Sequence, residues 1–128
     1  MSIFLWKISK IVFSNALDAN RLTNLTSISF ENFNTSNVTD MHYMFEGCSS
    51  LTSINLSSFD MSKVTNTTDM LSDCSALTEI KTPNAIGSAA VNLPTRTGYS
   101  WVDKNNTSIK YTQINSTNVG KTLILKAN

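Results

Sequence analysis

The chain has 128 residues, a length that fits one ordinary domain or one short array of repeats. Apolar residues make up 41% of the chain and charged residues only 15%, and serine, threonine and asparagine take the place of the missing charge. The formal net charge of +1 comes without a basic stripe, which argues against nucleic acid as a partner and against a surface for anionic lipids.

Residues 1–24 show little regular pattern. Their longest apolar stretch, Ile3 to Phe13, contains two lysines, so it is too short and too charged to span a membrane. No positive segment precedes the stretch and no small-x-small site follows it, so we see no signal peptide in this chain. Because Phe4 lies 26 residues before Phe30, we interpret residues 1–24 as a degenerate repeat that caps the next one.

Two consecutive segments of 26 residues, 25–50 and 51–76, have closely similar sequences. They read LTSISFENFNTSNVTDMHYMFEGCSS and LTSINLSSFDMSKVTNTTDMLSDCSA, and they align without gaps. A third copy begins with LTEIKT, but it then loses the pattern, and Ala85 stands where the earlier copies have phenylalanine. We therefore predict repeats at 25–50 and 51–76 and a partial repeat at 77–82.

Each repeat is predicted to begin with a short strand. In the second copy Ile54 and Leu56 alternate with Ser53 and Asn55, which is typical of a half-buried strand. No single repeat buries its apolar face alone, so neighbouring copies are expected to stack with equivalent side chains in columns. The expected columns are Leu25, Leu51 and Leu77, then Ile28, Ile54 and Ile80, and then Met44 and Met70.

A short helix is predicted to follow each strand. Apolar residues recur at helical spacing at Val38, Met41, Met44 and Phe45. Thr39 suits an N-cap and Gly47 suits the position after a helix, which predicts one to two helical turns from Asp40 to Glu46. The expected fold is an α/β-type solenoid, a leucine-rich-repeat-like stack of short parallel strands and short helical turns.

Residues 83–128 are predicted to form a C-terminal β cap module. A strand signal at 99–102, a turn signal at 103–106 and loose alternation up to residue 114 predict a β hairpin, and residues 122–125 offer one last strand. We expect Trp101 and Tyr111 to cover the open end of the stack. A poorly capped strand edge at the opposite end favours self-association.

Residues 25–80 resemble the BspA-type leucine-rich-repeat surface proteins of bacteria. These proteins carry tandem copies of F-D-T-S-N-V-T-D-M-x-x-M-F-x-G-C-x-x-L-T-x-L-D-L-S, and this chain reads FNTSNVTDMHYMFEGCSSLTSINLSSFDMS from residue 33. Thr67, Leu71 and Asp73 depart from the pattern, so a looser second helical turn is expected. The resemblance implies an extracellular or cell-surface protein used in adhesion, with no cofactor and no active site.

The outward row of the parallel strands is the candidate binding surface. It consists of Ser27, Ser29, Ser53, Asn55, Glu79 and Lys81. Repeat proteins present such rows as extended platforms. The first hypothesis is therefore a non-enzymatic adhesion or protein-binding module for a protein or glycan on a host or neighbouring cell. The alternative is a structural spacer or stalk within a larger surface protein.

A hydrolase that uses His42 is the third hypothesis. Thr68 takes the place of His42 in the next repeat, so we predict an exposed histidine without a catalytic role. Cys48 and Cys74 lack the spacing of a zinc site and are expected as buried thiols, with a disulfide as the alternative. Residues 103–105 lack the glycine and the distal glutamate of a calcium loop, so a tight turn is expected and neither a metal nor a cofactor.

Overall fold

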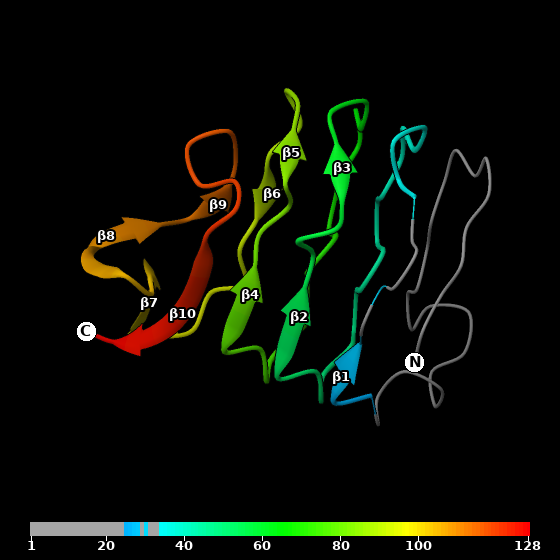
Figure 1. The fold of residues 1–128 in the computed structure, drawn as a ribbon. Helices are drawn as coiled ribbons and strands as arrows, with labels where there is room; N and C mark the ends of the chain where they lie inside the picture. Colours follow the sequence, from blue (N-terminus) through cyan, green and yellow to red (C-terminus); the bar gives the residue numbers. More distant parts are fainter. Residues whose placement is uncertain (1–24, 29, 31–33) are drawn as a thin grey trace.

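The computed structural model describes residues 25–28, 30 and 34–128, and in this part of the chain it contains strands but no helix (Figure 1). Six of the ten strands form one mixed sheet, and the others form two sheets of two strands. The predicted α/β-type solenoid is therefore wrong, because the helical layer is missing and the main sheet runs from parallel to antiparallel pairing without solenoid closure. The cap predicted at residues 1–24 lies outside the described residues.

The main sheet begins with three parallel strands from three consecutive copies of the repeat. These are β1 (Ser27–Ile28), β2 (Ser53–Asn55) and β4 (Glu79–Lys81). Ile28 pairs with Ile54 and Ile54 with Ile80, so the isoleucine column predicted from the period is confirmed. All three isoleucines are buried, since an isolated strand of three residues can bury its apolar side chain only against its neighbours.

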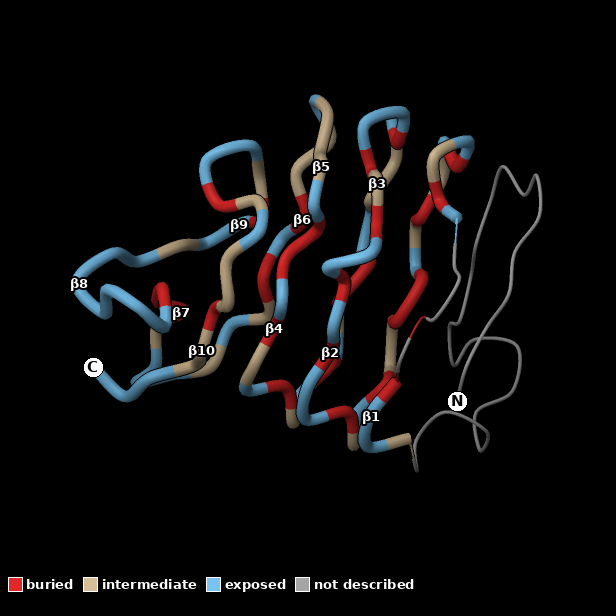
Figure 2. Tube along the Cα trace, in the orientation of Figure 1, coloured by how far each residue is buried: buried red, intermediate tan, exposed pale blue. Residues whose placement is uncertain are grey.

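Backbone hydrogen bonds at the same spacing hold the residues that follow the predicted leucine column. The Thr52 N–H donates to the Thr26 carbonyl at 3.1 Å, and the Thr78 N–H donates to the Thr52 carbonyl at 2.9 Å. Leu51 and Leu77 are buried and Leu25 is half-buried against the same core. Buried residues recur along each coil of the described chain (Figure 2).

The segments that return from these strands pair with one another as well. The strands β3 (Asp60–Met61) and β5 (Ala85–Ile86) are parallel, so the third copy keeps its backbone pairing after its sequence pattern has ended. Thr35 joins the first copy to the second, because its buried hydroxyl donates to the Asp60 carbonyl at 2.9 Å and accepts from the Asp60 N–H at 2.8 Å.

The helix predicted from Asp40 to Glu46 is a run of turns instead. Every second N–H leaves its own repeat and bonds to the next one, at 2.8–2.9 Å: Met41 to Asn66, Tyr43 to Thr68, Phe45 to Met70 and Gly47 to Ser72. The N–H groups between them close three-residue turns, from Met44 to Met41, Glu46 to Tyr43 and Cys48 to Phe45. A helix would use all of these donors within the segment.

Left-handed backbone at equivalent positions rules out the helix in both copies. The φ angles are 58° at Tyr43 and 52° at Asp69, and then 74° at Gly47 and 61° at Asp73. A right-handed helix admits none of these values. Consecutive turns advance by a few residues each, so they place apolar side chains at nearly the spacing of a helix face, and Val38 through Phe45 were misread for that reason.

The C-terminal strands close the other side of the main sheet. The strand β10 (Thr122–Ala127) lies antiparallel to β4 and to β7 (Tyr99–Asp103), and β7 pairs with β8 (Asn106–Tyr111) in the predicted hairpin. Figure 1 shows that β10 lies between β4 and the hairpin. The last strand of the described chain therefore covers the edge of β4, a role that we had expected of Trp101 and Tyr111.

Two short strands, β6 (Val91–Asn92) and β9 (Gln113–Ile114), pair beside this hairpin and complete the described fold. Val91 and Ile114 are register partners and are both fully buried, so they extend the core of the repeats into the C-terminal module. Among the described residues no helix is long and apolar enough to cross a membrane.

Candidate functional site

The outward side chains of β1, β2 and β4 lie side by side as the sequence predicted. Ser27 is the register partner of Ser53, and Ser53 is the partner of Glu79. A second row joins Asn55 to Lys81. The inward isoleucines fix this arrangement, because a slip of one residue would turn every isoleucine to solvent. Ser29, the remaining predicted member, lies outside the described residues.

The exposed members of this surface differ in what they are free to do. Ser27, Ser53 and Lys81 are exposed, and the structure shows no hydrogen bond from any of their side chains to the described part of the chain. Glu79 is half-buried and pairs with Lys104 of the C-terminal module, with Nζ and Oε2 3.6 Å apart. This pair is largely solvated, so it contributes little to stability.

Asn55 has a structural role that the sequence reading missed. Its side-chain oxygen accepts hydrogen bonds from the Ser57 N–H at 3.0 Å and from the Ser57 hydroxyl at 2.6 Å. This geometry is an Asx turn, which ends β2 and starts the return of the chain. Asn55 therefore has only its amide N–H groups available for a partner.

The surface continues onto β10, which the sequence reading did not include. Thr122 pairs with Lys81 and Ile124 pairs with Glu79, and both side chains are half-buried. The signal was present in the alternation of residues 122–125, but the order of the strands was not predictable from it. The described outward face is therefore polar over the repeats and gains an isoleucine next to the C-terminal module.

His42 is half-buried and not exposed as predicted. Its Nδ1 and its backbone N–H both bond to the Asp40 carboxylate, and its ring meets the Tyr43 ring edge to face, with 4.8 Å between their centroids. No hydroxyl or thiol is bonded to this histidine among the described residues. The arrangement orients the imidazole within a turn and brings no nucleophile to it.

Both cysteines are buried free thiols, which confirms the first of the two expectations for them. Burial raises the pKa of Cys48 to about 11 and that of Cys74 to about 12. The Cys74 thiol donates to the Phe45 carbonyl at 3.1 Å and so links two copies of the repeat. Because the thiolate is the reactive form, neither group is a nucleophile at neutral pH.

The Asp103 carboxylate holds a tight turn, as expected. It accepts from the Asn105 N–H at 2.9 Å and pairs with Lys121 at 3.0 Å. The Asn105 hydrogen bond and the Lys121 ammonium keep the pKa of Asp103 below its ordinary value, and the same pair raises the pKa of Lys121. Among the described residues no cluster of three potential metal ligands occurs.

Residues 2–90 match a family described as "Mycoplasma protein of unknown function, DUF285", and this match covers well over half of the chain. No curated protein and no solved structure matches the chain significantly.

Proposed function

The chain belongs to the DUF285 family of Mycoplasma proteins of unknown function, and from this premise we propose that it is a non-enzymatic binding module of the bacterial cell surface. The single observation that supports the proposal best is the register of β1, β2 and β4. It lines up Ser27, Ser53 and Lys81 on one exposed face with side chains that the described fold does not use.

The resemblance of residues 25–80 to BspA-type surface proteins supports the same role. Small hydroxyl side chains on a regular sheet let a partner approach the backbone closely over several strands. Each copy offers only a few polar groups, so the affinity per copy is low, and avidity over several copies or chains raises it. A protein or a glycan on a host or neighbouring cell is the expected partner.

The experiment replaces Ser53 with arginine and compares the variant with Ser88→Arg. Both serines are exposed, but Ser88 lies outside the outward row. Binding of each labelled chain to an immobilised panel of extracellular-matrix proteins and glycans is measured, together with thermal melting. We expect Ser53→Arg to lose binding at unchanged melting temperature and Ser88→Arg to bind as the wild type does.

A result in which no member of the panel binds the wild-type chain, or in which both variants bind equally well, would contradict a binding role for this face. The structural spacer would then be the better account. Asn55 is a poor position for the test, because its substitution would disturb the turn after β2.

A further inference from the structure

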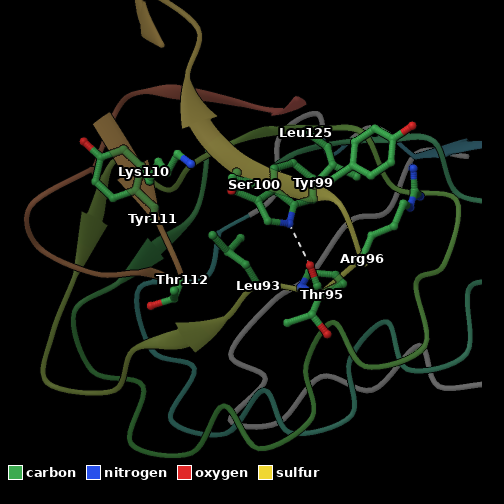
Figure 3. Close-up of a pocket in the computed structure, with 11 residues that line it drawn as sticks. Leu93, Thr95, Arg96, Tyr99, Ser100, Lys110, Tyr111, Thr112 and Leu125 are labelled. Atoms are coloured by element: carbon green, nitrogen blue, oxygen red, sulfur yellow. Dashed lines mark hydrogen bonds between the residues drawn. The ribbon is translucent and has the colours of Figure 1, made fainter. Parts of the chain in front are cut away.

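A small open cavity lies in the C-terminal module, away from the outward row. Its volume is about 220 Å³, and it lies between the segment 93–96, the hairpin of β7 and β8, and Leu125 of β10. Figure 3 shows Tyr99 and Arg96 on one side of the cavity, Tyr111 and Lys110 on the other, and Leu93 between them. Cavities for drug-sized ligands measure about 300–1,000 Å³, so this one fits a single ring.

Hydrogen bonds of the chain itself hold the walls of the cavity in place. The Trp101 indole N–H donates to the Pro94 carbonyl at 2.8 Å, which ties the segment 93–96 to β7. The Leu93 N–H donates to the Thr112 carbonyl at 3.0 Å and ties the same segment to the end of the hairpin. The cavity is thus preformed, and a ligand does not have to order these walls.

The lining combines ring faces with hydroxyl groups. Tyr99, Trp101 and Tyr111 contribute aromatic rings, and Thr95 and Thr112 contribute hydroxyls. The face of an aromatic ring is electronegative and attracts the polarised C–H groups of a sugar ring. The hydroxyls can exchange hydrogen bonds with those of a sugar.

The charges around the cavity are all positive. Arg96 and Lys110 line it, and no carboxylate does. Residues 83–128 contain one arginine, four lysines and a single acidic residue, Asp103, for a formal charge of +4, whereas residues 25–82 carry −5. The positive charge is therefore specific to this module.

Two of the five cations are neutralised and three are not. Lys121 pairs with Asp103 and Lys104 with Glu79. Arg96, Lys110 and Lys126 make no ion pair within the described part of the chain, and two of these three line the cavity.

Arg96 is held in position for an anion. Its guanidinium lies 5.5 Å from the centroid of the Tyr99 ring and also donates to the Ser75 carbonyl. A guanidinium has five N–H donors, so several remain for a carboxylate.

We propose that this cavity binds an acidic sugar, that is, one six-membered ring that bears a carboxylate. The ring stacks on the aromatic side chains and the carboxylate meets Arg96 or Lys110. An acidic peptide would also satisfy the charge, but a cavity of this size holds one ring and not an extended chain. The proposal does not depend on the outward row, so either site can fail without the other.

The test follows the backbone and indole N–H resonances of the full chain by NMR during titration with single sugars. The probes are glucuronate, galacturonate and N-acetylneuraminate, with glucose as the neutral control and tetraglutamate as the acidic peptide. We expect at least one acidic sugar to shift the Trp101 indole and the Ser100 and Thr112 amides, and glucose and tetraglutamate to leave them in place.

Two matched variants separate a specific carboxylate contact from general charge. Arg96→Gln should weaken binding about tenfold or more, because a charge-assisted hydrogen bond is lost. Lys126→Gln removes the same charge from a cation that does not line this cavity, and it should change binding little. Tyr99 is partly exposed, so Tyr99→Ala should keep the fold and also weaken binding.

No shift with any acidic sugar would overturn the proposal, and so would equal shifts with glucose. Equal weakening by Lys126→Gln and Arg96→Gln would reduce the effect to general charge. Stronger shifts of the same resonances by tetraglutamate would assign the cavity to acidic peptides instead.

Discussion

The backbone at Asp73 offers a direct test of the turn structure. Asp73 is exposed, has a φ of 61°, and takes the place of Gly47 of the first copy. Holding alanine at a left-handed φ costs about 1–2 kcal/mol. The greater freedom of glycine in the unfolded chain offsets about 0.4–1 kcal/mol of that difference. Asp73→Gly should therefore be more stable than Asp73→Ala by roughly 0.5–1 kcal/mol.

Both substitutions remove the same carboxylate, so their difference isolates the backbone. Urea unfolding followed by tryptophan fluorescence measures it. The control pair is Ser53→Gly and Ser53→Ala, in the extended strand β2, where glycine should be the less stable by about 0.5–1 kcal/mol. In a helix alanine would be favoured at residue 73 by about 0.8–1 kcal/mol, so that order would refute the turn structure.

Three further substitutions or conditions test the packing. Ile54→Ala should destabilise the fold by about 2–5 kcal/mol in urea unfolding, because Ile54 is buried between two other isoleucines, and a loss below about 1 kcal/mol would contradict the column. Gly87→Ala should cost about 1–3 kcal/mol and lower the melting temperature, because the new Cβ would lie 2.5 Å from the Ser62 carbonyl oxygen; an unchanged melting temperature would count against this approach. Above pH 9 the unfolded thiols of Cys48 and Cys74 lose protons that the folded thiols keep up to about pH 11 and 12, so stability should be complete below pH 9 and fall as the pH rises. This fall should be smaller in a variant with both cysteines replaced by alanine, and equal slopes would argue against buried thiols.

The parts of the fold that follow from the period were predictable from the sequence. Ile28, Ile54 and Ile80 pair as expected, because a side chain that recurs every 26 residues can be buried by its own copies. The hairpin of β7 and β8 was also visible, since its strand and turn signals are local.

The turns were not predictable by the same reasoning. The spacing from Val38 to Phe45 fits one face of a helix, and it says nothing of where the backbone donors go. The signal that was missed is a polar one. Asn34, Asn55 and Asn66 each stand two residues before a serine or threonine whose N–H they accept, which marks Asx turns.

The same polar signal explains the candidate site. Asn55 was expected to face a partner, but its oxygen is committed to the turn, and His42 was expected to be exposed, but Asp40 holds it within a turn of its own. The C-terminal cavity was out of reach, because it depends on contacts between the segment 93–96 and a hairpin whose position the sequence did not give.

The most direct measurement is the NMR scalar coupling across hydrogen bonds, which links each donor nitrogen to the carbonyl carbon of its acceptor. The structure predicts couplings from Tyr43 to Thr68, from Phe45 to Met70 and from Gly47 to Ser72, each across two copies of the repeat. Couplings from these amides to carbonyls four residues earlier in the same segment would show a helix and would contradict the pairing of the copies.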